Sequence, residues 1–329
     1  MNEELLLRST QLEQALFEVR KVVVGQDRVL ERLVAGLLAD GHCLLEGVPG
    51  LGKTLVLKTM ARVFGGSFSR IQFTPDLMPS DVVGTRIYRA SEERFDVELG
   101  PVMANFVLAD EVNRAPAKVQ SALLEVMGER QVTIGDRTFP APSPFLVMAT
   151  QNPIESEGVY PLPEAQRDRF LMRIPVTYPT PEEEKEIVRR AGVGPDAAEE
   201  VLRAEDVVAM QRLAADLYVD PAIIDYAIRI VAATRDLEEA GFRHLAGAIE
   251  YGASPRASLG LIAAARGLAL LRGRGYVLAQ DVYDVAYDVL NHRLVLSYDA
   301  LADGVTVDDV LVEVLSTMPA PKLAVREES

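Results

Sequence analysis

Residues 47–54 read GVPGLGKT and match the phosphate-loop pattern G-x-x-x-x-G-K-[ST]. The apolar run HCLLEG comes directly before this loop, and the helix-like run KTLVLKTMARVF begins inside it. In such a loop the glycines let successive backbone N–H groups point at an anion, and the helix N-terminus adds a favourable dipole. The pattern therefore predicts a strand–loop–helix unit that binds phosphate, in preference to an ordinary glycine turn before a helix.

Two further apolar runs follow, NFVLADE at residues 105–111 and FLVMATQN at residues 145–152. Short, nearly continuous apolar runs are typical of strands buried on both faces of a parallel sheet. The helix-like run AKVQSALLEVMGE at residues 117–129 lies between them. This alternation predicts an α/β core in which helices sandwich a parallel sheet.

Length and composition set the outer bounds. The 329 residues predict about two domains, and 49% hydrophobic with 25% charged residues is an ordinary globular balance. Glu3 and Glu4 occupy the N-terminal region that is basic in a secretion signal. No apolar run is long enough to span a membrane. Cys43 is the only cysteine. These features predict a cytoplasmic protein without a membrane span.

The net charge of −15 is unevenly distributed. Residues 1–181 hold 19 Lys and Arg against 23 Asp and Glu, whereas residues 182–329 hold 15 against 26. An acidic surface repels phosphate backbones, so the charge argues against a broad nucleic-acid-binding face, although a narrow basic channel in an assembly stays possible.

The second half of the chain has a different pattern. Thr180-Pro181 with Glu183 has the form of a capping box with proline in the first helical turn. Asp220-Pro221 and Ser254-Pro255 repeat this start signal, and helical patterns follow each of them. We therefore predict an N-terminal helical segment at residues 1–20, the α/β core at 21–180, an all-α domain at 181–315 and a flexible tail at 316–329.

Polar residues at the ends of the predicted strands suggest hydrolytic chemistry. Lys53 would reach the β- and γ-phosphates, and the Thr54 hydroxyl would bind Mg²⁺. Asp110 and Glu111 end a buried strand, where desolvated acids need a role; Asp110 would hold Mg²⁺ and Glu111 would polarise the attacking water. Asn152 ends the third strand and could orient this water or contact the γ-phosphate, although Asn before Pro is also a turn former.

These motifs together resemble the MoxR family of AAA+ ATPases. The match covers most of residues 20–180 in order, and it is thinner over the second half, where GASPRA is its clearest element. The segments that carry it are VVVGQD, GVPGLGKT, RIQFTPDLMPSDVVGT, VLADEVNR, QSALLEVMGERQVTIG, ATQNP, NPIESEGVYPLPEAQ and LPEAQRDRF.

The resemblance implies an AAA+ P-loop NTPase core followed by an all-α lid, with ATP and Mg²⁺ between them. It also implies a homo-oligomeric ring, most often a hexamer, in which ATP lies between neighbouring subunits. In this family the partners carry von Willebrand A domains, and the motors assemble or activate protein complexes or insert metals. The identity of the client protein is not implied.

Three arginines receive roles from the resemblance. Arg169, in DRF, corresponds to the finger that reaches the γ-phosphate held by the next subunit. Arg167 departs from the family pattern, which more often has an apolar residue there, and could share this role or pair with Asp168. Arg256 corresponds to the sensor-2 arginine, which contacts phosphate from the lid of the same subunit; its place in the first turn of a helix opposes the macrodipole.

Val23, Val24 and Gly25 resemble the segment that lines the adenine pocket. The predicted nucleotide contacts of the phosphate loop are Gly47, Val48, Pro49, Gly50, Leu51, Gly52, Lys53 and Thr54.

Two segments resemble insertions of the family. Residues 84–102 are similar to its helix-2 insert, and residues 130–142 have the pattern of a hairpin with Gly135-Asp136 as the turn. Such loops face the pore or the client in related motors, and otherwise they decorate a sheet edge.

Three functions are compatible with the sequence. The first is an ATP-hydrolysing, chaperone-like remodelling motor. The second is a nucleic-acid motor, because replicative helicases share the same insertions; the acidic charge argues against it. The third is a scaffold gated by ATP with little turnover, which Glu111, Asn152 and Arg169 argue against.

Overall fold

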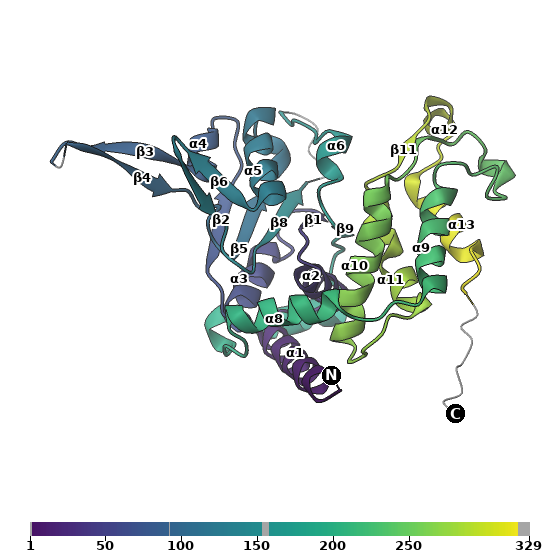
Figure 1. Cartoon of the computed structure of the whole chain (residues 1–329), viewed down its shortest axis with the longest axis horizontal. Coiled ribbons are helices and arrows are strands. Elements are labelled where there is room, and N and C mark those ends of the chain that lie inside the picture. Colours follow the sequence, from purple (N-terminus) through teal and green to yellow (C-terminus); the bar gives the residue numbers. More distant parts are fainter. Residues whose placement is uncertain (1, 92, 153–157, 322–329) are drawn as a thin grey trace.

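The computed structural model describes residues 2–91, 93–152 and 158–321. A five-stranded parallel sheet forms the centre of the first half (Figure 1), as the alternating sequence pattern predicts. Its strands follow the order β2 (Phe68–Gln72), β5 (Phe106–Asp110), β8 (Leu146–Gln151), β1 (Cys43–Glu46) and β9 (Met172–Pro175). The three inner strands are the three apolar runs of the sequence, whereas the two edge strands have no such run.

Helices precede, cover and follow this sheet. Those of the first half are α1 (Asn2–Val22), α2 (Asp27–Leu38), α3 (Lys53–Val63), α4 (Pro79–Val83), α5 (Ala117–Glu129) and α6 (Glu164–Arg167). Those of the second half are α7 (Pro181–Arg189), α8 (Ala204–Ala215), α9 (Pro221–Ala233), α10 (Pro255–Leu271), α11 (Ala279–Leu290), α12 (Tyr298–Ala302) and α13 (Val307–Thr317). Within the described part of the chain, no helix is both long and apolar enough to cross a membrane.

The two faces of the sheet bury separate sets of side chains, because successive strand residues point to opposite faces. Cys43, Leu45 and Leu108 join the core that contains α1, α2, α3 and the lid helices. Leu44 and Val107 join the core that contains α4 and α5. Cys43 is fully buried, and burial raises the pKa of its thiol to about 12, so it is a core side chain and no nucleophile.

Two antiparallel hairpins extend from the core. β3 (Gly84–Arg89) and β4 (Arg94–Leu99) pair within the predicted 84–102 insertion and project far from the sheet (Figure 1). β6 (Gln131–Ile134) and β7 (Arg137–Pro140) form the second hairpin, with Gly135 and Asp136 between them as predicted. Residue 92 at the first tip lies outside the described residues.

The three helix starts read from the second half are confirmed. Thr180 and Glu183 form the capping box of α7, Asp220 caps α9 and Ser254 caps α10. The helical domain also contains a short antiparallel pair, β10 (Ile249–Tyr251) with β11 (Val295–Leu296), which an all-α reading does not include.

The ends of two elements differ from the predicted boundaries. Helix α1 continues to Val22, beyond the 1–20 segment, and α13 continues to Thr317, so the first residues of the predicted 316–329 tail are helical. From residue 322 onward the tail lies outside the described residues.

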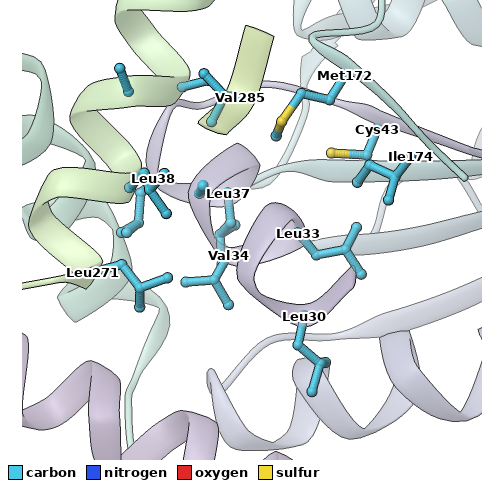
Figure 2. Close-up of a cluster of buried hydrophobic side chains, with 14 of the residues drawn as sticks. Leu30, Leu33, Val34, Leu37, Leu38, Cys43, Met172, Ile174, Leu271 and Val285 are labelled. Atoms are coloured by element: carbon cyan, nitrogen blue, oxygen red, sulfur yellow. The ribbon is translucent and has the colours of Figure 1, made fainter. Parts of the chain in front are cut away.

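Helix α2 lies between the sheet and the helical domain. Figure 2 shows Leu33, Val34 and Leu37 of α2 among side chains from the sheet, such as Cys43, and from the helical domain, such as Leu271. These residues are at most 6% exposed, so α2 joins the two halves through a continuous apolar core.

A buried ion pair lies in the same interface. Asp288 of α11 is fully buried and accepts hydrogen bonds from Arg28 at 2.7 Å and from Arg32 at 2.8 Å. Arg32 is also buried and donates to the Asp284 carbonyl at 2.7 Å. The Asp288 carboxylate therefore accepts from one buried guanidinium, that of Arg32, and from one partly exposed guanidinium, that of Arg28.

We predict that Asp288→Ala lowers the free energy of unfolding by about 3 kcal/mol, because it removes one of the two carboxylates that pair with the buried Arg32 and leaves only Glu31 at 2.8 Å. Arg20→Ala is the matched control, since it breaks an exposed pair between Arg20 and Asp27 that is worth about 1 kcal/mol or less. Urea unfolding of both variants measures the difference, and equal losses would contradict the prediction.

Candidate functional site

The phosphate loop connects β1 to α3. Gly50 and Gly52 have φ values of 87° and 74°, a region that L-residues with a side chain rarely adopt. At Gly47 the restriction is space instead, because an added Cβ would lie 2.7 Å from the Val176 carbonyl oxygen. The glycines of the motif therefore meet two separate demands of the loop.

A polar cavity of about 460 Å³ opens at this loop. It brings together residues from the ends of four strands and the start of α3, which lie far apart in the sequence. The cavity is lined by Gly47, Pro49, Gly50, Leu51, Gly52, Lys53, Thr54, Leu55, Arg70, Gln72, Asp110, Glu111, Thr150, Gln151 and Asn152. Every predicted loop contact except Val48 is in this set, together with Asp110, Glu111 and Asn152.

Lys53 begins α3 at the wall of this cavity. Its ammonium donates to the Gly47 carbonyl within its own loop. Burial lowers the pKa of Lys53, while the charges of Asp110, Glu111 and Glu46 act in the opposite direction. The cation therefore lies among carboxylates at the place where the sequence predicts phosphate.

Asp110 and Glu111 are linked through Thr150 on the neighbouring strand β8. The Thr150 hydroxyl donates to one Asp110 carboxylate oxygen at 2.6 Å and accepts from the Glu111 backbone N–H at 2.8 Å. One hydroxyl therefore fixes both residues of the acid pair, a role that only the pairing of β8 beside β5 creates.

Glu111 has an unusual backbone. Its φ of 55° and ψ of 51° lie in the left-handed region, which costs a residue with a side chain about 1–3 kcal/mol. Its carboxylate accepts from Gln72 at 3.1 Å and pairs with Arg114 at 3.2 Å. Strain of this kind persists where surrounding contacts impose it, and it is common at functional sites.

Arg70 and Gln72 are site residues that the sequence analysis missed. Arg70 donates to Asp110 at 2.7 and 3.1 Å and to Gln72 at 2.7 Å. Both residues belong to the edge strand β2, whose sequence FSRIQ has no apolar run. Their spacing of two places them on one face of a strand, and both lie in RIQFTPDLMPSDVVGT, one of the segments that carry the family resemblance.

A second, mostly apolar cavity of about 260 Å³ shares Gly50, Leu51, Gly52 and Leu55 with the first. Val23 and Val24 line it, whereas Gly25 does not, and a Cβ added at Gly25 would lie 2.7 Å from the Glu183 side chain. The remaining lining residues are Val22, Gln26, Val56, Pro179, Ile187, Arg190, Ala191, Gly192 and Val193. An apolar slot beside a polar one fits a nucleobase and its phosphates.

The structure separates Arg167 from Arg169. Arg167 is half-buried, and its pKa is lowered first by burial, with Glu164, Arg173 and Glu46 as the nearby charges. The guanidinium of Arg169 instead donates to the Leu124 carbonyl at 2.6 Å. Neither arginine lines the two cavities of its own chain.

Arg256 lies beside the same segment. It pairs with Asp168 at 3.3 Å, and its side chain is 59% exposed. It does not line the phosphate-loop cavity, so in this structure the lid arginine contacts the segment around Arg169 and not the phosphate loop. Residues 153–157, which carry part of the family pattern before this segment, lie outside the described residues.

Comparisons with known proteins agree with this geometry. The profile of the ATPase family associated with various cellular activities (AAA) matches residues 42–172, and that of the AAA lid domain matches residues 244–314. Chaperone MoxR1 of Mycobacterium tuberculosis is 62% identical, with 95% of this chain and 83% of that protein covered. Protein MoxR of Methylorubrum extorquens is 33% identical, with 92% and 93% covered.

A solved structure is similar over almost the whole chain. It is the crystal structure of a protein from Cytophaga hutchinsonii that is inferred to be an ATPase. The TM-score is 0.92 at 46% sequence identity, and the match covers 97% of this chain and 98% of the other.

We predict that Lys53→Ala abolishes most ATP binding while the fold persists, because the Lys53 side chain faces the cavity and contributes no apolar core contact. Lys58→Ala is the matched control, since Lys58 is exposed on the same helix. Calorimetric titration with ATP measures affinity, and circular dichroism checks the fold. Near-normal affinity in a folded Lys53→Ala chain would contradict the role of Lys53 as a phosphate contact.

Proposed function

Since this chain belongs to the MoxR family of AAA+ ATPases, we propose that it hydrolyses ATP and uses the energy as a chaperone-like motor that remodels protein complexes. One observation carries the proposal. Lys53, Asp110 and Glu111 meet with Thr54 and Asn152 around one polar cavity that continues into an apolar slot.

ATP fits this pair of cavities in one orientation. The adenine would occupy the apolar slot beside Val23, Val24 and Leu55, which attracts a flat, weakly polar ring. The phosphates would contact the loop N–H groups and Lys53. This placement follows from the difference between two cavities that share walls, one lined mostly by apolar side chains and the other by more polar ones.

The residues present also suit Mg²⁺. The Thr54 hydroxyl and the Asp110 carboxylate line the same cavity and offer the oxygen ligands that this ion prefers. When bound, Mg²⁺ supplies positive charge that stabilises the phosphate oxygens. Arg70 pairs with Asp110 in the present arrangement and would share that carboxylate with the ion.

Glu111 would polarise the attacking water, with Asn152 as the residue that orients it. The contact with Gln72 holds the Glu111 carboxylate on the cavity wall. The adjacent acid at 110 is engaged by Thr150 and Arg70, so the two carboxylates have separate partners and can perform separate tasks.

The proposed working form is a homo-oligomeric ring, with a hexamer as the expected size. Arg169 contacts neither cavity of its own chain and would serve the nucleotide of the neighbouring subunit. Arg256 would release Asp168 and contact phosphate instead. Its pair with Asp168, at 3.3 Å, is exposed on the Arg256 side, so this exchange is feasible.

We further propose, on the family relationship alone, that the partner is a protein with a von Willebrand A domain and that the work is assembly, activation or metal insertion. Chains carrying Glu111→Gln should retain ATP and trap the client in a pull-down. An ATPase assay with and without single-stranded DNA separates this function from that of a nucleic-acid motor, for which DNA would stimulate turnover.

Replacing the water-polarising carboxylate should separate binding from hydrolysis. We expect Glu111→Gln to bind ATP normally and to lose turnover by about 10²-fold or more, the general-base scale. Glu238→Gln changes an exposed glutamate of the lid and should leave both quantities unchanged. Equal loss of binding and hydrolysis in Glu111→Gln would show a structural carboxylate.

The finger role of Arg169 requires two chains and can be tested by mixing. We expect Arg169→Ala subunits to bind ATP but hydrolyse it poorly, because an arginine supplied by a neighbour is worth about 10³–10⁵ in rate where measured in GTPases. Lys53→Ala subunits lack nucleotide but still offer Arg169, so mixing the two should restore activity. Additive rates despite confirmed co-assembly would leave Arg169 as surface charge.

A further inference from the structure

Three consecutive residues after helix α11 hold residues 168–173, the stretch that carries Arg169. Asn291 exchanges hydrogen bonds with the Arg173 backbone oxygen at 3.0 Å and the Arg173 guanidinium at 3.3 Å. The His292 Nε2 donates to the Phe170 carbonyl at 3.0 Å. Arg293 contacts residues 168, 170 and 171. We call residues 291–293 the lid clamp and residues 168–171 the finger segment.

Arg293 brackets Arg169 on both sides. Its guanidinium donates to the Asp168 carboxylate at 2.8 Å, to the Phe170 carbonyl at 2.7 Å and to the Leu171 carbonyl at 3.1 Å. It also reaches the Asp168 carbonyl at 3.4 Å. The backbone groups directly before and after Arg169 are therefore bound to one side chain of the lid.

This guanidinium is buried, with only 3% of its side chain exposed. Burial lowers the pKa of Arg293, and the Asp168 carboxylate counteracts this. Desolvating a guanidinium is costly, and a well-packed apolar residue often stabilises a fold as well or better. The hydrogen bonds of Arg293 instead hold the backbone on both sides of Arg169.

The residues on either side of Arg169 are held by the core and by the lid, while Arg169 itself is exposed. Phe170 is fully buried in the core on the α5 side of the sheet. Asp168 turns to the lid, where Ser254 and Arg256 at the start of α10 contact it at 3.3 Å in addition to Arg293. Arg169 between them is exposed, and its guanidinium donates to the Leu124 carbonyl of α5 at 2.6 Å.

We propose that the lid clamp, through Arg293 and Asp168, positions Arg169 for the nucleotide of the neighbouring subunit. The reach of each finger is then set by the lid of its own subunit, which also borders its own nucleotide cavity through Ile187 and Arg190. A shift of the lid in one subunit changes turnover in the next. This inference rests on the proposed finger role of Arg169.

The test mixes full-length variants after pull-down of differently tagged subunits has confirmed co-assembly. Arg293→Met removes the donors but keeps an unbranched side chain. We expect it to bind ATP normally and to lose about 10- to 100-fold in kcat, since a displacement of about 1 Å can cost 10²-fold. Mixed with Lys53→Ala, it should regain activity; mixed with Arg169→Ala, it should not, because neither subunit then offers a working finger.

Arg274→Met is the matched control, because Arg274 pairs with the buried Asp281 elsewhere in the lid and should show no such defect. Asp168→Asn should repeat the mixing pattern of Arg293→Met, and it is the variant to use if Arg293→Met does not fold. Arg293→Lys should restore part of the lost kcat without changing ATP affinity.

Several outcomes would overturn the inference. They are full turnover by Arg293→Met alone, recovery when Arg293→Met is mixed with Arg169→Ala, or the same mixing pattern in Arg274→Met. Failure of Arg169→Ala to be rescued by Lys53→Ala would remove both the finger role and this inference. Rescue there, with normal activity in Arg293→Met, would remove this inference alone.

Discussion

The burial of helix α2 on two sides is the contact on which the arrangement depends. Its apolar residues pack against the sheet and against the lid at once (Figure 2), and Arg32 satisfies the buried Asp288 across the same interface. The segment before α2 lines the apolar cavity, and the strand after it leads into the phosphate loop. Because α2 holds the lid at the β9 side of the sheet, the lid clamp can reach the finger segment.

Single polar groups shared between elements give the site its geometry. The Thr150 hydroxyl holds both residues of the acid pair, because it donates to the Asp110 carboxylate and accepts from the Glu111 backbone N–H. The Asp168 carboxylate plays the same part between core and lid, since it accepts from Arg293 after α11 and from Arg256 in the first turn of α10. Each shared group couples two elements, so a change at one of them is felt at the other.

How much of the site could be predicted from the sequence depended on the type of strand. The three inner strands are buried on both faces, so their apolar runs were visible, and Asp110, Glu111 and Asn152 at their ends were predicted. The edge strand β2 has mixed exposure and no run, so Arg70 and Gln72 on it were missed. Thr150 lies within a predicted strand, but its role required knowing that β8 lies beside β5.

The sequence by itself determined the phosphate loop, the wound α/β core, the capped helices and the family, because these depend on local spacing of glycines, caps and apolar residues. Only the tertiary structure decided where the arginines act. Arg167 and Arg169 are two positions apart, yet Arg167 is half-buried near Glu46 and Arg173, whereas Arg169 is exposed and donates to a carbonyl of α5. Glu46 beside Arg167 and the Leu124 carbonyl bound by Arg169 come from segments more than 40 residues away. A side chain's burial is set by such packing, which no local pattern encodes.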